Sequence, residues 1–379
     1  MRLAGAAAAL GAITLAAGVA AGNERAWAGW LLASFGVLTV GLAGFIFVAI
    51  QYAAGARWSV ALRRLPEAMM AAIPIGGAAV LALILLRPDP YPWSHGLEAH
   101  GGALAAFKTA WLSWPFLLTR GVIYVVVWVT LARAIVGHSR RQDEDRDPAH
   151  TTRNTRLSVA GIIIFALTIS LAGFDWIMSL EPEWYSTIFG VYQFAGLFSS
   201  GLAVIIVLAV WLRRGPLAFV VSDEHLHDLG KLLFAFCTFW MYIWFSQYML
   251  IWYANLPEET GYFVVRTRGL WEPLFILNML LNWAIPFAAL LRRSPKRRPE
   301  ILVKVAVVVL VGRWLDLYLM IVPPIAQRSG LVPPFGLWEV ASVVALASAT
   351  AWIVMRALWQ APLVPVNDPG LGHSLQYHS

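Results

Sequence analysis

Long apolar runs separated by shorter polar stretches make up most of this chain. Ten of the runs come close to, or exceed, the roughly 20 residues that a helix needs to cross a bilayer. The runs lie at residues 3–21, 28–52, 67–86, 114–136, 157–180, 187–212, 231–254, 271–292, 301–322 and 336–358. The pattern predicts an all-α integral membrane protein with about ten transmembrane helices.

Two of the predicted helices carry a similar short motif. The fifth contains FDWIM (174–178) and the ninth contains RWLDL (313–317); each has an acid near a Trp and is followed by proline. This short repeat predicts two parallel four-helix bundles plus flanking helices, an arrangement familiar from membrane carriers. The resulting division is a first helix and outer turn (1–27), a first bundle (28–186), a second bundle (187–325), a last helix (326–360) and a cytoplasmic tail (361–379).

The first apolar run has an alternative interpretation. It begins with Met1-Arg2, continues with Ala and Gly, and ends in AGVAAG, which resembles a secretory signal. We expect the segment to be kept as the first helix of the protein.

The composition agrees with a membrane protein. Hydrophobic residues make up 59% of the chain and charged residues 13%, whereas a soluble domain carries about 25% charged residues. The net charge of +7 could suggest a nucleic-acid partner, but the basic residues cluster in alternate loops and we find no soluble domain that could bind nucleic acid. We therefore expect lipids and other membrane subunits as partners, and no nucleic acid.

Lysine and arginine residues are distributed unevenly between the two sides of the predicted membrane. The termini and the loops after even-numbered helices carry twenty of them, and the opposite side carries six. These six are Arg25, Arg87, Lys108, Arg266, Arg268 and Arg328. By the positive-inside rule, both termini are expected in the cytoplasm.

Cysteine and histidine are the residues that would hold a redox metal centre. The chain has one cysteine, Cys237, so it offers no ligand set for an iron–sulfur cluster. A haem within the membrane normally takes axial ligands, usually His, from spanning helices. All eight histidines fall in predicted loops or in the tail: His95, His100, His138, His150, His225, His227, His373 and His378. We expect no metal cofactor bound by this chain.

Two loops stand out by their composition. The cytoplasmic loop at 137–156 mixes charges of both signs, which predicts a solvated connector. The outer loop at 87–113 contains several prolines and then the apolar piece ALAAF (103–107), which predicts an interfacial or re-entrant segment. The proline-containing tail from Ala361 is expected to be extended.

Four charged side chains lie inside predicted transmembrane helices: Arg120, Asp175, Arg313 and Asp316. A rise of about 1.5 Å per residue places Arg120 about 9 Å, the two acids about 8 Å and Arg313 about 12 Å from the outer surface. A charge in hydrocarbon costs roughly 2.5–3.5 kcal/mol on insertion scales, so such charges mark buried pairs or pathways. We expect the two cations and two anions to neutralise one another.

This group of charges has two interpretations. As a structural network, it would join helices and satisfy the buried charges without taking part in turnover. As a functional site, it would form a proton route or a quinol-headgroup site near the outer face, with Glu181 at a neighbouring helix end as a further member.

Aromatic residues cover every face of the seventh predicted helix. They would serve either as a flat surface for a quinone or as packing against lipid and partner subunits, and we favour packing. The candidate quinone contacts, taken from the outer half of this helix and from the Trp beside Asp175, are Trp176, Gln247 and Tyr248.

Three segments resemble the polytopic subunits of alternative complex III, a bacterial quinol:electron-acceptor oxidoreductase. They are DWIMSLEPEWYSTIFG (175–190), FSQYMLIWYANLPEET (245–260) and GRWLDLY (312–318). The chain length and the ten predicted helices are similar to the second, smaller polytopic subunit, the ActF type, which is distantly related to the NrfD/polysulfide-reductase membrane subunits.

The resemblance implies a location in the bacterial inner membrane and a role in a respiratory complex. It implies as partners a sister polytopic subunit, a multihaem cytochrome c, an iron–sulfur subunit and a terminal oxidase. Haem c and iron–sulfur clusters would belong to those partners, and quinol oxidation is associated mainly with the sister subunit. The family gives no quinol ligand that maps onto a position in this chain.

Two alternatives use the same features differently. A secondary transporter would fit parallel repeats and intramembrane charges, although these charges lie toward one surface and not at the midplane. A purely structural scaffold subunit of the same complex would need the charges only to hold helices together. Haem-containing partners on purification would support the respiratory complex or its scaffold, and an isolated colourless oligomer would support transport.

Overall fold

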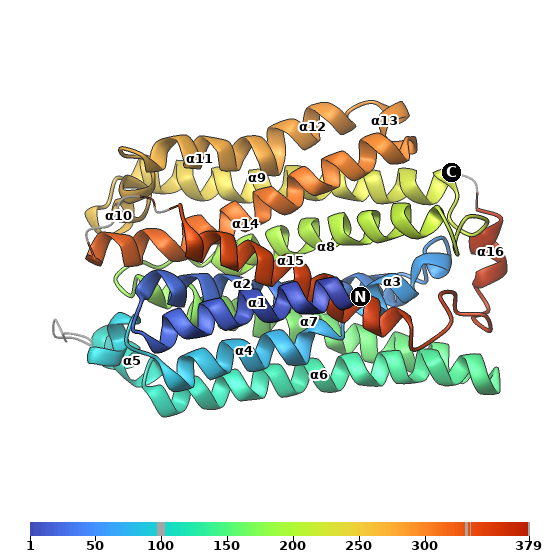
Figure 1. Cartoon of the computed structure of the whole chain (residues 1–379), viewed down its shortest axis with the longest axis horizontal. Helices are drawn as coiled ribbons and strands as arrows, with labels where there is room; N and C mark the ends of the chain where they lie inside the picture. Colours follow the sequence, from blue (N-terminus) through green and yellow to red (C-terminus); the bar gives the residue numbers. More distant parts are fainter. Residues whose placement is uncertain (97–102, 330–332, 334, 378–379) are drawn as a thin grey trace.

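All regular elements of the computed structural model are helices, within the residues that it describes, 1–96, 103–329, 333 and 335–377. In this part of the chain, ten helical segments are long and apolar enough to cross a membrane, which makes the chain a multi-pass membrane protein of the all-α class. Figure 1 shows most of them side by side along the long axis of the molecule, with both termini toward the same end.

The helices have the following bounds: α1 Arg2–Ala20, α2 Glu24–Ala53, α3 Arg64–Met69, α4 Ala72–Leu86, α5 Ala103–Trp111, α6 Trp114–Asp145, α7 Ala149–Trp176, α8 Phe189–Arg213, α9 Asp223–Ala254, α10 Pro257–Arg266, α11 Trp271–Met279, α12 Ile285–Leu290, α13 Arg293–Arg297, α14 Pro299–Ser329, α15 Leu337–Leu358 and α16 Leu371–Leu375. Short 3₁₀ segments are η1 Val60–Leu62, η2 Pro92–His95 and η3 Met178–Leu180, and η4 Leu280–Ala284 is a π-helix. The end of the molecule that carries α5 and α10 is called the outer end, after the orientation expected from the sequence, and the end that carries α16 is called the inner end.

The long helices form two neighbouring four-helix groups. In the first, α2 and α6 each pack on α4 and on α7. In the second, α8 packs on α9 and α14, and the broken helix α11–η4–α12 lies between α9 and α14. Helices α2 and α7 pack on α8, and α2 also packs on α14, so one hydrophobic core runs through both groups.

Helices α1 and α15 flank the first group and pack on each other and on α2. Gly11 in α1 lies against the backbone of Ala345 in α15, where a Cβ would overlap it. Small residues at such contacts allow the close backbone approach on which helix packing in membranes depends. At the outer end of the pair, Arg25 donates to Glu339 at 2.7 Å and ties α2 to α15.

The prediction that residues 137–156 form a loop is wrong. Helix α6 continues to Asp145 and α7 begins at Ala149, so the two helices extend through almost all of it. Polar side chains pair across the two extensions, because Gln142 donates to Thr151 at 2.9 Å and Nδ1 of His138 lies 2.9 Å from Nδ1 of His150. The mixed charges therefore belong to helix ends, where most of them are exposed.

The placement of all histidines in loops or the tail is also wrong. His138 and His150 belong to α6 and α7, and His225 and His227 lie near the start of α9. His225 there forms a capping box with Ser222, since each side chain satisfies the other's backbone N–H. His100 and His378 lie outside the described residues.

The tail does not run as an extended strand. It forms the short helix α16 and docks on the inner end of both groups. Arg63 pairs with Asp368, Ser374 donates to the carbonyl of Trp58 at 2.5 Å, and Tyr377 donates to Asp228 in α9 at 2.7 Å. The tail therefore joins the loop after α2 to the start of α9.

Candidate functional site

The first buried ion pair joins α6 to the end of α7. Asp175 is fully buried, and Arg120 contacts it through two hydrogen bonds, from Nε at 3.1 Å and from Nη2 at 2.8 Å. The carboxylate also accepts from Nε1 of Trp111 at 2.9 Å and from the hydroxyl of Tyr124 at 3.1 Å. Four donors around one carboxyl group match the ionised form, which can only accept hydrogen bonds.

Helix α5 covers this pair on the outer side. It includes residues 103–107, for which the sequence predicts an interfacial or re-entrant segment, and it folds back so that its last residue, Trp111, reaches Asp175. The guanidinium of Arg120 contacts the rings of Trp111 and Phe116, 3.9 and 4.2 Å from their centroids. Arg120 also donates to the carbonyl of Trp111 at 3.0 Å, so these contacts hold α5 against Arg120.

The second buried ion pair lies in the second group. Arg313 and Asp316 are one turn apart on α14 and are 2.6 Å from each other, and both are buried. Asp316 accepts further hydrogen bonds from Tyr192 in α8 and from Asn278 in α11, the latter at 3.2 Å. Arg313 donates from Nη2 to Gln193 at 3.0 Å.

The backbone around this second pair is adapted to hold it. Gly196 leaves the space that the guanidinium of Arg313 occupies, because a Cβ there would overlap it. Gly312 in α14 does the same for Asn282, which donates to Asn278 at 2.7 Å. Asn282 lies in the π-helix η4, just before Pro286, which has no N–H to continue an α-helical ladder. Single-turn π segments are frequent at functional sites.

The four charges thus form two separate pairs, one in each group. Each acid has a base as its partner, as expected from the energy of an unpaired charge in hydrocarbon. Asp175 is the last residue but one of α7, whereas Arg313 and Asp316 lie near the middle of α14. Arg313 lies farther from the outer end of its helix than expected, because α14 continues past Ile321 to Ser329.

A further ion pair at the outer end, between Glu181 and the buried Arg266, was not expected from the sequence. Arg266 is 2% exposed, and its Nη2 lies 2.7 Å from Oε2 of Glu181. Its Nε donates to the carbonyl of Leu319 at 2.7 Å, and Nη2 also approaches the carbonyl of Met320 at 3.4 Å.

The prolines of α14 explain why an arginine is needed there. In an α-helix the N–H of residue 323 would bond to the carbonyl of 319, and that of 324 to the carbonyl of 320. Pro323 and Pro324 have no N–H, so Arg266 supplies the missing donors. The signal in the sequence was the double proline, which predicts two free carbonyls near the outer surface.

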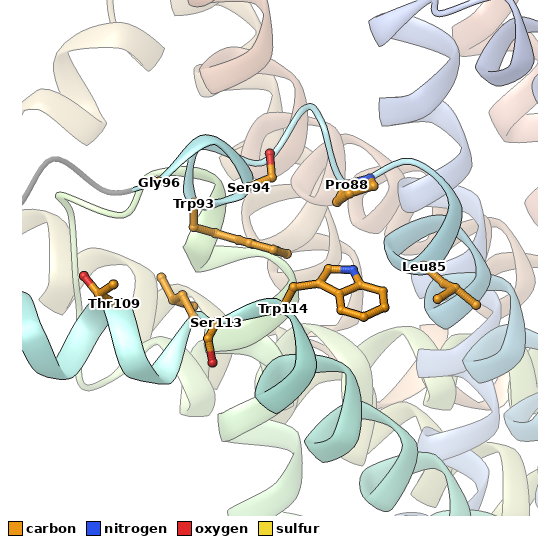
Figure 2. Close-up of a pocket in the computed structure, with 9 residues that line it drawn as sticks. Leu85, Pro88, Trp93, Ser94, Gly96, Thr109, Ser113 and Trp114 are labelled. Atoms are coloured by element: carbon orange, nitrogen blue, oxygen red, sulfur yellow. The ribbon is translucent and has the colours of Figure 1, made fainter.

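An outer cavity of about 650 Å³ lies beside the first pair, between the end of α4, η2 and the α5–α6 turn. Figure 2 shows Trp93 and Trp114 in its wall, with Pro88 and Leu85 nearby. Nε1 of Trp93 donates to Ser179 at 3.2 Å, and Ser179 donates to the backbone carbonyl of Asp175 at 2.6 Å. A polar connection therefore runs from the wall of this cavity to the backbone of the buried acid.

The expected quinone contacts do not form one site. Trp176 is fully buried in the first group among Phe35, Tyr124 and Trp128. Gln247 and Tyr248 lie in the second group.

Gln247 accepts from Ser186 at 3.2 Å and borders a cavity of about 10 Å³ next to Tyr192 and Tyr262. That volume corresponds to about one water molecule. The quinone site as expected from these three residues therefore has no common cavity.

The inner end carries a polar cluster that the sequence showed only as a helix-end Glu67. Arg64 pairs with Glu67 at 2.5 Å and also with Asp143 of α6. Among the described residues, Oε1 of Glu67 and the Nε atoms of Arg64 and Arg140 have no hydrogen-bond partner, and all three side chains border a cavity of about 10 Å³. Buried groups without partners are the positions where a water molecule is most stabilising.

Comparison with known proteins adds no family to this description. A scan against protein-family models finds no match, and a search of curated proteins finds no similar chain. What the chain does must therefore be inferred from its own residues.

Proposed function

We propose that the chain is a polytopic membrane subunit of a bacterial respiratory quinol:electron-acceptor oxidoreductase that resembles alternative complex III, ActF type. The observation that carries the proposal is the mutual placement of the three segments that carry the resemblance. Ser186 in the first segment donates to Gln247 in the second at 3.2 Å. Glu181 in the first binds Arg266, which in turn binds Leu319, next to the third segment.

In this proposal the chain moves protons and its partners move electrons. Oxidation of a quinol releases two protons and two electrons and leaves a quinone. The electrons pass to haem c and iron–sulfur centres of partner subunits. Protons leave toward the outer side through the carboxyl groups of Asp175 and Asp316, with Arg313, Arg120 and Glu181 as neighbouring charges. The water-sized cavity beside Tyr192 and the outer cavity beside Trp93 support this direction.

Neutral isosteres of the two acids test the proton role. Asp175→Asn and Asp316→Asn keep the side-chain shape but cannot ionise, and each amide N–H₂ would face a donor. If the acids carry protons, the complex assembles and quinol oxidation or proton release slows in both variants. Asp89→Asn, an exposed outer carboxylate, is the matched control and should leave turnover unchanged.

A purely structural network gives the opposite pattern. The variants would then assemble poorly, because breaking a buried pair costs about 3–5 kcal/mol, and the complex that survives would turn over normally. Normal assembly and turnover in both variants would remove the acids from either role.

Co-purification tests the assignment to a respiratory complex. An affinity-tagged chain extracted in mild detergent should carry haem-containing subunits, visible as c-type absorption in the eluate. A colourless oligomer of this chain alone would instead favour the secondary transporter.

We also propose that both termini face the cytoplasm of the bacterial inner membrane. The support is the excess of basic residues on that side. Reporter fusions after the C-terminus and within the loop at 255–269 should report opposite sides. The same side for both would contradict this orientation.

A further inference from the structure

An apolar groove lies between three helices near the outer end of the first group, and it has a volume of about 300 Å³. Helix α1 lines it with Ala16 and Ala20, α4 with Leu83 and Leu86, and α2 with Trp30. The groove exists because α1 and α4 both pack on α2 but have little packing on each other. The small side chains of α1 keep it open.

The interior of the groove offers apolar surface. Trp30 is its largest side chain, and the indole Nε1 already donates to the carbonyl of Ala79 at 3.0 Å. Ala16, Ala20 and Leu86 are exposed, on a face that lipid would cover. The buried part of any occupant must therefore be apolar, because a polar group would find no partner there.

Arg87 is the one charged side chain in the groove wall among the residues described, and it lies at the outer end. It directly follows α4, and its carbonyl accepts a hydrogen bond from Nε1 of the buried Trp27 at 2.8 Å. Its side chain extends toward the turn between α1 and α2, where a Cβ on Gly22 would be 3.5 Å from Nη2. The cation is thus held where two apolar helices end, at the level expected for lipid headgroups.

The guanidinium of Arg87 has donors to spare. Its Nε forms an ion pair with Asp89 at 3.3 Å, in which the two side chains are 38% and 63% exposed. Such an exposed pair contributes little, because water competes for both charges. Nη1 and Nη2 have no acceptor among the residues that the structure describes. The two nitrogens of a planar guanidinium match two oxygens of a phosphate, a bidentate contact that lysine cannot make.

We propose that this groove binds one phospholipid from the leaflet at the outer end. Its phosphate accepts hydrogen bonds from Nη1 and Nη2 of Arg87, and one acyl chain lies in the groove against Trp30. The occupant has to combine an anion at one end with an apolar chain. A free phosphate lacks the chain, and an apolar helix of a partner would leave Arg87 without an anion. The bound lipid fills the gap between α1 and α4, and the site is independent of the proposed respiratory role.

Native mass spectrometry of the purified full-length chain tests the site. The delipidated chain is titrated in detergent with dioleoyl phosphatidylglycerol or with dioleoylglycerol, which has the same acyl chains and no phosphate. The quantity compared is the Kd of the most tightly bound lipid. Phosphatidylglycerol should bind about tenfold or more tightly than dioleoylglycerol, because only its phosphate can contact Arg87. Inorganic phosphate at the same concentration should not displace it.

Two variants with matched controls locate the binding. Arg87→Gln should weaken phosphatidylglycerol about tenfold and leave dioleoylglycerol unchanged, whereas Arg268→Gln, at an exposed outer position away from the groove, should change neither. Ala16→Trp fills the groove and should weaken both lipids about tenfold. Ala166→Trp adds the same ring to an exposed position of α7 and should change neither. Neither Ala16 nor Arg87 is buried, so both variants should fold.

Three results would overturn the site. They are equal affinity of the native chain for the two lipids, equal lipid binding by Arg87→Gln and Arg268→Gln, and equal lipid binding by Ala16→Trp and Ala166→Trp. Displacement of phosphatidylglycerol by inorganic phosphate would also refute it, because the acyl chain would then add nothing to binding. Loss of a co-purifying subunit from Ala16→Trp, with lipid binding unchanged, would assign the groove to a partner helix instead.

Discussion

Replacing Arg266 with Met should loosen the outer end of the second helical group. Arg266 is 2% exposed, and its guanidinium serves four partners at once, namely Glu181 and the carbonyls of Tyr262, Leu319 and Met320. Met has similar length and apolar volume but no donor, so the substitution removes the hydrogen bonds and leaves the packing.

The size of the effect follows from the groups left unpaired. Each buried carbonyl without a donor costs about 1–3 kcal/mol, and the 3.4 Å contact to Met320 belongs at the low end. Breaking a fully buried ion pair costs about 3–5 kcal/mol, but the side chain of Glu181 is 20% exposed and regains part of this from water. We expect a loss of roughly 3–5 kcal/mol in the free energy of unfolding.

The assay is unfolding of the detergent-solubilised chain by added sodium dodecyl sulfate, followed by Trp fluorescence. Arg268→Met is the matched control, because Arg268 lies in the same loop and is exposed, and it should change the free energy by less than about 0.5 kcal/mol. Arg266→Lys keeps the charge for Glu181 but lacks the planar fork, so it should recover only part of the loss.

A double-mutant cycle with Pro323→Ala tests the reason for the effect. The substituted alanine restores an N–H for the carbonyl of Leu319, so Arg266→Met should cost about 1–3 kcal/mol less in this background. Equal losses in the native and the Pro323→Ala backgrounds would refute the idea that Arg266 replaces the donors missing from α14. A loss as large for Arg268→Met would show that loop charge in general, and not this contact, sets the stability.

Three further predictions follow from other contacts. Gly196→Ala should destabilise the chain by roughly 1–3 kcal/mol, because its methyl group would displace Arg313, and Gly215→Ala, with open space around it, should lower the melting temperature little. A hydrogen bond to Asp228, together with burial, raises the pKa of Tyr377 to about 12 from 10.0. The folded-state pKa lies above the ordinary value, so this hydrogen bond stabilises tail docking fully below about pH 10, and the stabilisation is lost as the pH rises through 12. A fluorophore attached to the tail should become mobile over that pH interval. Tyr377→Phe should abolish this pH dependence. The purified chain alone should show no visible haem or iron–sulfur absorption, and a stoichiometric Soret band would contradict this.

Secondary structure and membrane class could be read from the apolar pattern. Length and hydropathy identified ten spans. In hydrocarbon every backbone group must bond within its own helix, so each span is one continuous run of apolar residues that can be recognised without knowledge of the rest of the fold. The boundaries at the inner ends were wrong for α6 and α7, whose polar extensions are stabilised by partners such as Gln142 and Thr151. Polar residues predict a solvated loop unless their contacts across helices are known.

The candidate site was only half visible in the sequence. The insertion energy of charge requires that Asp175 and Asp316 have partners. The choice of partner needed the fold: Arg120 pairs with Asp175 across two helices, and Arg313 pairs with Asp316 within one turn. The hydrogen bond from Trp111 to Asp175 depends on α5 folding back over the ion pair, and no local pattern in the sequence specifies that fold.

The sequence by itself determined that this chain crosses the membrane about ten times and carries charges that cannot stay unpaired. Both conclusions depend on solvation, which acts on each residue separately and leaves a pattern along the chain. Only the tertiary structure decided that Arg266 supplies donors to a proline-broken helix and that Arg87 lies at the end of an apolar groove. These features depend on how helices distant in sequence approach one another, and packing geometry of that kind leaves no periodic signal in the order of the residues.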